Sequence, residues 1–373
     1  EKSASARNAS LHLGAAVGEL KNAGLTAIRK GLLAGKADIF AANKKDLETA
    51  KAAGTTAPLV KRLGFGEEKL AEVCSGIESL IDLPDPVGRN IAARELDEGL
   101  ELYQVACPIG VIGIIFESRP DALVQISTLC LKSGNAVILK GGTEALETNR
   151  ILTDIIKRAG KEAGLPGGWI QLAETRDDVR GMLNLEKEID LIIPRGSNEF
   201  VKYIMDNTNI PVLGHADGIC HAYIHSDGDI EKATNIVVDS KTQYVAVCNA
   251  LETLLVHEDI AAAALPGITA ALIKKGVTVK GCDRTRTIVT VDQAIEADWL
   301  TEYLDFVLAI KIVDSAEEAM THIAKYGSHH TDTIICEDRA TAEAFMNRVD
   351  SASVLWNCST RFADGFRYGL GAE

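Results

Sequence analysis

From Pro108 onward the sequence alternates short apolar runs with segments of helical spacing, and this alternation constrains the fold more than any other feature. Runs such as residues 111–116 and 136–139 carry no charge, which indicates strands that are buried on both faces. Residues 122–132 and 144–163 have helical spacing and lie between or after them. Strands that alternate with helices form a parallel sheet covered by those helices, so the predicted fold class is α/β.

The alternation occurs in two series, which predicts two domains. A chain of 373 residues is too long for one ordinary core. Further strands are expected at residues 170–172, 189–193 and 210–213 in the first series, and at residues 251–256, 277–280, 307–313, 333–335 and 353–356 in the second.

The residues before the first series are expected to be mainly helical. Residues 15–20 and 28–50 have helical spacing, with breaks predicted at Gly24 and Gly54. Two prolines around Asp85 stop the last of these helices. Residues 91–106 then alternate in polarity around Asp97-Glu98-Gly99, which predicts a β-hairpin.

Composition argues against several classes of function. The net charge of −14 disfavours nonspecific binding to nucleic acid or to an anionic membrane, and the longest apolar runs are too short to span a bilayer. The eight cysteines are scattered without a Cys-x-x-Cys pair, which argues against a zinc cluster and favours a reducing cytosol. His215 and the pair His329-His330 lack a metal-ligand spacing, so no metal is expected.

The glycines at the expected strand ends indicate a phosphate or ribose site without the usual fingerprint. The first strand carries only Gly110 and Gly113, so the Gly-x-Gly-x-x-Gly pattern is absent. Lys140-Gly141-Gly142 follows the next strand and leads into a helix, which suits a nucleotide ribose or phosphate. A plain strand-to-helix turn with a surface lysine would account for the same residues.

Two other strand ends carry candidate ligands. Pro194-Arg195-Gly196-Ser197 precedes a helix, so Ser197 either only caps that helix or also faces a pyrophosphate or nicotinamide ribose. Arg119 follows the first strand, where ligands collect in open α/β sheets. Its guanidinium matches a carboxylate or a phosphate. The alternative is a salt bridge that closes the strand end.

Cys248 differs from the other cysteines in its neighbours. Small residues precede it, and Asn249-Ala250 and an apolar strand-like run follow it. A thiol in such a place is either a nucleophile for covalent acyl chemistry or a packed core residue, and the residues alone leave both interpretations open.

Several motifs occur together in one order. They are Pro108-Ile109-Gly110-Val111, Phe116-Glu117-Ser118-Arg119-Pro120, Lys132-Ser133-Gly134-Asn135-Ala136, Lys140-Gly141-Gly142, Ile189-Asp190-Leu191-Ile192-Ile193-Pro194-Arg195-Gly196-Ser197, Gly214-His215-Ala216-Asp217-Gly218-Ile219-Cys220-His221, Cys248-Asn249-Ala250-Leu251-Glu252-Thr253, Tyr326-Gly327-Ser328, His330-Thr331-Asp332 and Asn357-Cys358-Ser359-Thr360-Arg361-Phe362. With these motifs the chain resembles, over nearly its whole length, the γ-glutamyl phosphate reductases of the aldehyde dehydrogenase superfamily.

The resemblance implies two Rossmann-like α/β domains and a β-hairpin arm. It places a cofactor-binding domain at residues 1–87 and 107–222, an oligomerisation hairpin at residues 88–106 and a catalytic domain at residues 223–356. Residues 357–373 are implied to return toward the cofactor domain. The family continues beyond this point with a glycine-rich segment that helps to build the subunit interface.

The resemblance also implies roles for single residues. Cys248 matches the nucleophile, and Asn249 beside it is assigned to the catalytic group. The implied cofactor is NADPH; Lys140 would contact the adenosine ribose or its 2′-phosphate, and Glu302 the nicotinamide ribose. The complete set of implied cofactor ligands is Lys140, Gly141, Gly142, Arg195, Gly196, Ser197 and Glu302. The expected substrate or phosphate ligands are Ser118, Arg119, His215 and Arg361.

The implied activity is NADPH-dependent reduction of L-glutamyl 5-phosphate to L-glutamate 5-semialdehyde through a cysteine thioester, in proline biosynthesis. Hydrolytic relatives carry a glutamate base in a Leu-Gly-Gly setting, whereas residues 213–218 contain no glutamate. The reductase is therefore preferred to a hydrolytic aldehyde dehydrogenase, and an inactive fragment is the other alternative. A cytoplasmic homo-oligomer acting on a small molecule is implied, with glutamate kinase as the candidate pathway partner.

Overall fold

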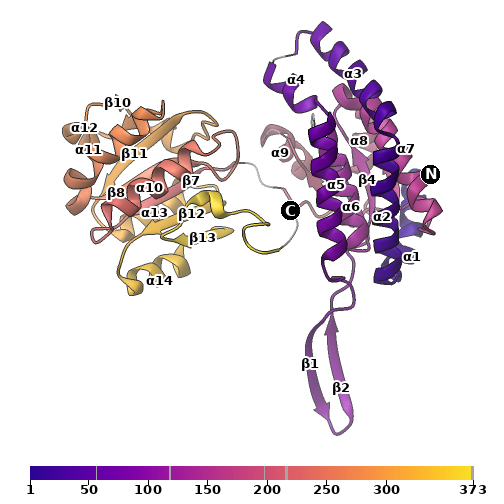
Figure 1. Ribbon diagram of the computed structural model, residues 1–373. Coiled ribbons are helices and arrows are strands. Elements are labelled where there is room, and N and C mark those ends of the chain that lie inside the picture. Colours follow the sequence, from indigo (N-terminus) through magenta and orange to yellow (C-terminus); the bar gives the residue numbers. More distant parts are fainter. Residues whose placement is uncertain (56, 117–118, 197, 215–216, 371–373) are drawn as a thin grey trace. The chain divides into compact units, whose positions relative to one another are not determined.

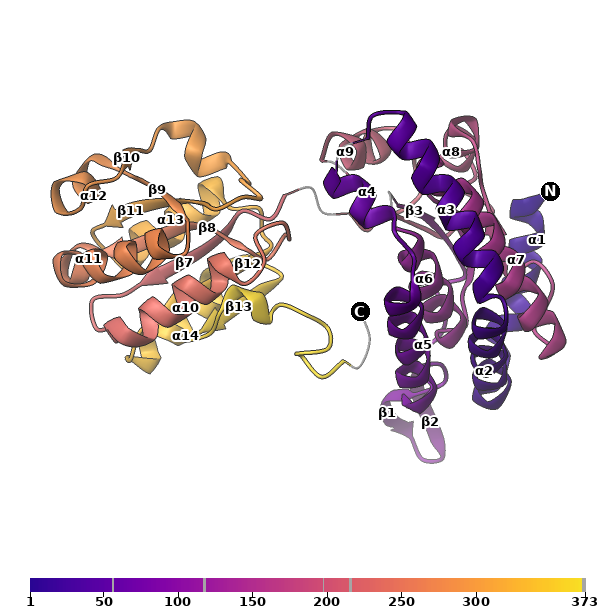
Figure 2. The ribbon, with the colours of Figure 1, turned by 45° about the horizontal axis from the view of Figure 1, so that its top comes forward.

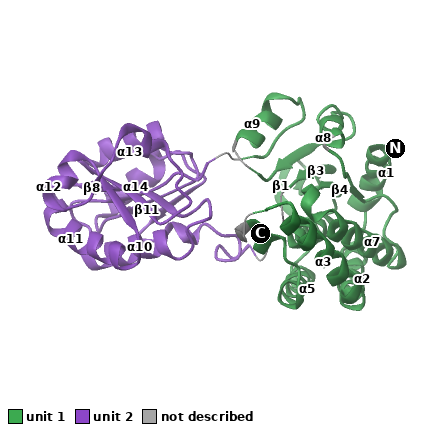
Figure 3. Ribbon diagram, turned by 90° about the horizontal axis from the view of Figure 1, so that it is seen from above, with its two compact units in different colours: residues 1–215, 372 green, residues 216–371, 373 purple. Residues whose placement is uncertain are grey.

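The computed structural model describes residues 1–55, 57–116, 119–196, 198–214 and 217–370. The chain forms two compact units, residues 1–215 and residues 216–371 (Figure 3). Each unit has its own parallel sheet and its own hydrophobic core. Among the described residues, no helix is both long enough and apolar enough to cross a membrane.

Unit 1 begins with helices that form an outer layer. These are α1 (Lys2–Gly14), α2 (Gly18–Ala34), α3 (Lys36–Ala52), α4 (Ala57–Leu63) and α5 (Glu67–Asp82). Helices α2 and α3 pack on α7 (Leu146–Glu162), and α2 and α5 pack on α6 (Pro120–Lys132) (Figure 1). The expected break at Gly24 is wrong: this glycine lies inside α2, where a Cβ would come within 2.7 Å of Leu165 Cδ1. Gly54, with a φ of 74°, follows the end of α3 as expected.

The sheet of unit 1 has four parallel strands in the order β5-β4-β3-β6. They are β3 (Val111–Ile115), β4 (Ala136–Lys140), β5 (Ile170–Leu172) and β6 (Leu191–Pro194), and they are joined by η1 (Thr143–Ala145), α6, α7 and α8 (Arg176–Met182), with α9 (Asn198–Asp206) following β6. Residues 210–213 form an isolated bridge between Ile192 and Val212 instead of the expected strand. The strand order reverses between β3 and β6, and ligands of open α/β sheets bind at the carboxyl ends of strands at such a point.

The predicted hairpin is formed by β1 (Asn90–Asp97) and β2 (Leu100–Val105), which pair antiparallel and project from the helices of unit 1 (Figure 1). Its turn lies at the expected residues, with Gly99 at a φ of 72°. Every residue of both strands is exposed. The large apolar side chains among them are Ile91, Leu96, Leu100, Leu102, Tyr103 and Val105.

The sheet of unit 2 has seven parallel strands in the order β10-β9-β11-β8-β7-β12-β13. The strands are β7 (Cys220–Ile224), β8 (Leu251–His257), β9 (Thr278–Gly281), β10 (Asp292–Gln293), β11 (Val307–Val313), β12 (Thr331–Ile335) and β13 (Ser353–Trp356). The helices are α10 (Ile230–Thr242), α11 (Glu258–Lys274), α12 (Asp283–Ile288), α13 (Ala316–Tyr326) and α14 (Arg339–Arg348), with the short η2 (Glu296–Leu300) and η3 (Thr360–Phe362). Helices α10 and α11 pack on each other and on β8, whereas α13 and α14 pack on each other and on strands β11 to β13 (Figure 2).

The division between the units differs from the domain boundary implied by the sequence. An end of the first domain at residue 222 would fall inside β7. Because β7 pairs with both β8 and β12, it belongs to the sheet of unit 2, and the units divide between residues 215 and 216. Residues 357–370 group with unit 2, where Tyr368 Oη donates to Ser353 Oγ at 2.9 Å. The return of residues 357–373 toward the first domain stays a prediction.

Candidate active site

Cys248 lies half-buried in the loop between α10 and β8. This loop is tied to the segment that follows β13. The carbonyl of Asn249 accepts a hydrogen bond from Thr360 Oγ1 at 2.7 Å, and Asn249 Nδ2 donates to the carbonyl of Ala363 at 2.9 Å. The side chain of Asn249 is therefore buried and holds the cysteine loop in place.

Gly218 packs directly against the backbone of Cys248. A Cβ at Gly218 would lie 2.5 Å from Cys248 Cα and closer still to its carbonyl oxygen. Real Cβ atoms do not approach backbone so closely, so only glycine fits at this position without displacing the loop. Cys220 Sγ, in β7, also donates to the Cys248 carbonyl at 3.2 Å. Residues 218–220 thus contact the backbone of Cys248 at two points.

Glu302 lies beside the same glycine. Its half-buried carboxylate accepts a hydrogen bond from the backbone N–H of Gly218. Burial raises the pKa of Glu302, and the nearby carboxylate of Asp217 raises it further, while the hydrogen bond opposes both effects. Gly218 therefore brings together two residues that the sequence resemblance assigns to the site, Cys248 and Glu302.

A buried ion pair closes the ends of the cysteine loop. Lys241 Nζ, near the end of α10, lies 2.7 Å from Glu252 Oε2 in β8, and both side chains are 0% exposed. Burial raises the pKa of Glu252 and lowers that of Lys241, because each charged form loses its hydration, and the attraction between the two opposes both shifts. Motif comparison does not identify this pair, although a glutamate inside an otherwise apolar strand indicates a buried partner.

Two arginines converge beside the start of the cysteine loop. Arg361 Nε and Arg367 Nη2 each donate to Oε1 of Gln243 at 3.2 Å. Within the described ranges, neither guanidinium pairs with a carboxylate. Arg361 is one of the residues expected to bind substrate, whereas Arg367 is an addition from the structure. The other N–H groups of these two guanidinium groups form a positively charged site that suits an anion.

In unit 1, three expected cofactor ligands, Lys140, Gly141 and Gly142, lie at the carboxyl end of β4. Lys140 is buried, and its Nζ donates to the carbonyl of Gly141. A Cβ at Gly141 would overlap Asn149 Nδ2 and lie 3.2 Å from Phe116 Cε2. Gly142 precedes η1. The glycines therefore let the side chains of Asn149 and Glu144 lie against the backbone at this strand end.

The other expected residues of unit 1 lie at the ends of β3 and β6. Arg195 and Gly196 are exposed directly after β6, and the Arg195 N–H donates to the Ile115 carbonyl at 2.7 Å. Arg119 Nη2 lies 3.0 Å from Asp121 Oδ2, so the salt-bridge interpretation of this arginine is realised. Ser118, Ser197 and His215 lie outside the described residues.

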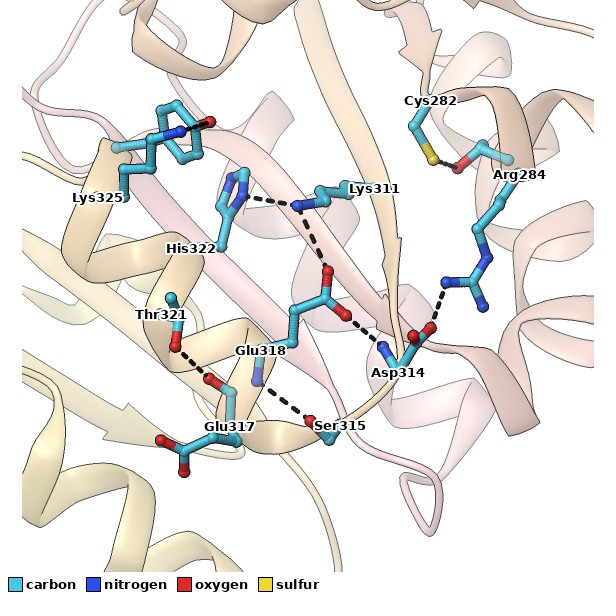
Figure 4. Close-up of polar contacts among 12 residues, drawn as sticks. Cys282, Arg284, Lys311, Asp314, Ser315, Glu317, Glu318, Thr321, His322 and Lys325 are labelled. Carbon is cyan, nitrogen blue, oxygen red and sulfur yellow. Dashed lines mark hydrogen bonds and ion pairs between the residues drawn. The ribbon is translucent and has the colours of Figure 1, made fainter.

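A polar cluster in unit 2 serves the packing of α13. Lys311 Nζ, on β11, lies 3.3 Å from His322 Nδ1 and 3.6 Å from Glu318 Oε1 (Figure 4). Burial lowers the pKa of His322 to about 2, and the charges of His221, Lys311 and Lys325 act in the same direction. The neutral imidazole accepts from Lys311 and attaches α13 to β11.

Comparison with known proteins places this geometry in a family. A sequence model described as "Aldehyde dehydrogenase family" matches residues 15–306. The chain belongs to the aldehyde dehydrogenase family. Enzymes of this family use a nicotinamide cofactor, and the two α/β units with their parallel sheets are the fold of the family.

Several proteins named γ-glutamyl phosphate reductase share high sequence identity with this chain. The γ-glutamyl phosphate reductase of Acetivibrio thermocellus is 60% identical over 367 residues, which are 98% of this chain and 85% of the relative. γ-Glutamyl phosphate reductase 1 of Synechocystis sp. is 54% identical over 99% of this chain and 85% of its own length. The crystal structure of the γ-glutamyl phosphate reductase of Thermotoga maritima matches with a TM-score of 0.98 at 39% identity, and the match covers 100% of this chain and 91% of that one.

Proposed function

We propose that this aldehyde dehydrogenase family member reduces L-glutamyl 5-phosphate to L-glutamate 5-semialdehyde with NADPH and releases phosphate, as a step of proline biosynthesis. The observation that carries the proposal is the likeness over nearly the whole chain to proteins named γ-glutamyl phosphate reductase. The placement of Cys248 against Gly218 and beside Glu302 supports it. These relatives do not favour the hydrolytic alternative.

Cys248 is the proposed nucleophile. Its thiolate attacks the γ-acyl carbon, a carbon–sulfur bond forms, and the bond to the phosphate oxygen breaks, which leaves a thioester and free phosphate. Reduction of the thioester gives a hemithioacetal, which collapses to the semialdehyde and returns the thiolate. The developing oxyanion needs hydrogen-bond donors, and the backbone N–H of Cys248 is the first candidate. Asn249 supports this step through its bonds to residues 360–363.

The nicotinamide, when bound, supplies the hydride. Lys140, Gly141 and Gly142 are proposed to hold the adenosine half, because a lysine and two glycines at the carboxyl end of β4 suit a ribose or its 2′-phosphate. Arg195, Gly196 and Ser197 would face the nicotinamide half, and Glu302 would accept hydrogen bonds from the nicotinamide ribose. NADPH rather than NADH is proposed from the sequence resemblance, with Lys140 as the candidate partner of the 2′-phosphate.

Arg361 is proposed to bind a carboxylate or phosphate of the substrate, with Arg367 beside it. Both guanidinium groups share Gln243, which directly precedes the cysteine loop. Ser118 and His215 remain proposed substrate ligands from the sequence resemblance. Arg119 is the weaker candidate among the arginines, because its guanidinium already pairs with Asp121.

The chain is also proposed to act as a cytoplasmic homo-oligomer, with glutamate kinase as its pathway partner. The exposed hairpin of β1 and β2 supports assembly, since a two-stranded hairpin without a buried face has little stability of its own. Replacing residues 90–105 by a short turn is then expected to lower the molecular mass measured by light scattering.

The central test uses Cys248→Ser. Turnover is measured as NADP reduction with glutamate 5-semialdehyde and phosphate. The expected result is loss of turnover in Cys248→Ser and full turnover in Cys107→Ser, which alters an exposed cysteine of unit 1. Turnover that continues equally without phosphate would refute the reductase proposal, and retained turnover in Cys248→Ser would remove this thiol from the mechanism.

A further inference from the structure

We propose that Glu252, with its charge balanced by Lys241, is a positioning residue that holds the Glu302 loop at the cysteine loop and thereby sets the affinity for the cofactor. The inference rests on the proposed function, because it gives Glu302 its role at the nicotinamide ribose. It adds two residues, neither of which touches substrate or cofactor, to those that determine cofactor binding.

The ion pair joins the two ends of the cysteine loop. Lys241 lies one residue before the end of α10, and Glu252 is the second residue of β8, so that Cys248 lies between them in sequence. Their charged atoms are 2.7 Å apart, and the water around them is fully excluded. In such surroundings the two side chains stay paired, because either charge alone would be buried without compensation.

The second oxygen of the same carboxylate reaches the Glu302 loop. Glu252 Oε1 accepts a hydrogen bond from the backbone N–H of Leu304 at 3.3 Å. Leu304 has a φ of 51°, in the left-handed region that a side chain with a Cβ disfavours. The bond from Glu252 therefore holds a backbone conformation that the sequence does not favour by itself. Relaxation of Leu304 would move Glu302, which lies two residues earlier.

Tyr303 fixes the middle of this loop. Its Oη donates to Asp298 Oδ1 at 2.8 Å, and Asp298 Oδ1 also accepts from Lys280 Nζ at 2.6 Å. The ammonium groups of Lys241 and Lys280 lie 5.9 and 5.4 Å from the centre of the Tyr303 ring, within reach of a cation–π interaction. Lys241 thus contacts both the Glu252 carboxylate, which anchors Leu304, and the ring of Tyr303.

The loop held in this way presents Glu302 to Gly218, and Gly218 packs on Cys248. One carboxylate consequently connects the helix before the nucleophile, the strand after it and the loop that carries Glu302. Stability alone does not explain a charged pair at this place, because well-packed apolar residues commonly replace a buried ion pair without loss. Positioning explains it, since an apolar side chain offers no acceptor to the Leu304 N–H.

Two double variants separate positioning from stability. Lys241→Met/Glu252→Gln removes both charges and keeps a carbonyl acceptor for Leu304, whereas Lys241→Met/Glu252→Met removes the acceptor as well. The second variant is expected to be the more thermally stable, because it buries no unsatisfied side-chain amide and the exposed Leu304 can turn its freed N–H to water. It is nevertheless expected to bind NADPH roughly tenfold more weakly than the first, the loss expected for one buried hydrogen bond. NADPH fluorescence titration gives the dissociation constants. A purely structural role predicts the opposite order of affinity, with tighter NADPH binding by the more stable methionine variant.

Hydrogen exchange gives a readout that does not depend on the cofactor. Peptides covering residues 302–306 are expected to exchange the Leu304 amide slowly in the wild type and in Lys241→Met/Glu252→Gln, and fast in Lys241→Met/Glu252→Met. If the glutamine variant does not fold, Lys241→Gln/Glu252→Gln, in which the two amides bond each other, takes its place. Lys232→Met/Glu337→Gln, at a surface ion pair of the same unit, is the control and is expected to leave both measurements unchanged.

Equal NADPH affinity and equal exchange in the glutamine and methionine variants would overturn the inference. The proposed function fails separately, when the wild type lacks phosphate-dependent turnover. In that case the exchange experiment still shows whether Glu252 holds Leu304. The Leu304 amide could stay protected in the glutamine variant and lose protection in the methionine variant while both bind NADPH equally. That result would show that Glu252 holds the loop but that the loop does not bind the cofactor, which also overturns the inference.

Discussion

The Cα of Gly218 packs against the Cα and carbonyl of Cys248, so the two loops that carry these residues cannot move independently. The contact joins the start of unit 2 to its candidate nucleophile. The N–H of the same glycine is bonded to Glu302, and one residue without a side chain therefore aligns two groups of the candidate site.

Gly218→Ala is expected to displace Cys248 and to lower kcat/KM by about 10²-fold, the loss associated with a shift of about 1 Å at a reacting group. Steady-state assay in the NADP-reducing direction measures it. Gly267→Ala, at a helical position of α11 where a Cβ meets open space, is the control and is expected to keep full activity. A fully active Gly218→Ala would show that the cysteine loop tolerates the displacement.

Arg361→Met is expected to raise the KM for glutamate 5-semialdehyde or phosphate by roughly tenfold to a hundredfold, because a hydrogen-bonded charge partner of the substrate is lost. Arg367→Met is expected to act in the same direction more weakly, since its side chain is more exposed. The dissociation constant of NADPH should stay unchanged in both. Arg348→Met, which breaks a surface pair with Glu317, provides the comparison, and an equal KM in all three variants would contradict the assignment.

Gly141→Ala is expected to weaken NADPH binding roughly tenfold or more, since the added methyl would overlap Asn149 and crowd the strand end. Fluorescence titration measures the affinity without turnover. Gly167→Ala lies in unit 1 with open space around the position and is expected to bind normally. Unchanged affinity in Gly141→Ala would place the cofactor away from the end of β4.

The stability of unit 2 is expected to fall in acid because of His322. Burial lowers its pKa from 6.5 to about 2, so the unfolded chain takes up a proton that the folded chain refuses. The stability of the fold with neutral His322 is therefore unaffected by this residue above pH 6.5. As the pH falls from 6.5 toward 2, the free energy of unfolding decreases by about 1.4 kcal/mol per pH unit.

Denaturant unfolding at pH 7.0 and pH 5.0, followed by tryptophan fluorescence, tests this. His322→Asn keeps an acceptor for Lys311 (Figure 4) and is expected to show a smaller loss of stability between the two pH values (chosen on either side of the ordinary histidine pKa of about 6.5). His329→Asn, at a mostly exposed histidine, should behave as the wild type. Equal pH dependence in wild type and His322→Asn would refute the prediction.

Apolar strands are the part of the fold that the sequence predicts best. Residues 307–313 and 353–356 coincide with β11 and β13, because predominantly apolar runs between helices have few other structures available. The central strand β7 does not follow from this pattern, since His221 interrupts it. The histidine is buried there because Asp332 Oδ1 of β12 lies 3.1 Å from its Nδ1, a partner that is remote in sequence.

The residues of the candidate site also fall into those that the sequence predicts and those that only the structure reveals. Cys248 and Glu302 follow from the resemblance to a family, since their motifs are continuous in sequence. Gly218, Arg367 and the pair of Lys241 and Glu252 depend on contacts between separate loops, and a single sequence does not report such contacts. Their signals are weak by themselves: a glycine after an aspartate, or a charge inside an apolar strand.

The strand order of unit 2 has a consequence for synthesis on the ribosome. β7 is the first strand of its sheet to be made, yet it lies between β8 and β12. Its edge toward β12 stays without a hydrogen-bonding partner until residues 331–335 have been translated, while the sheet of unit 1 is already complete in the chain. Because unpaired strand edges invite pairing with other chains, the nascent protein is most exposed to aggregation while its second half is being made.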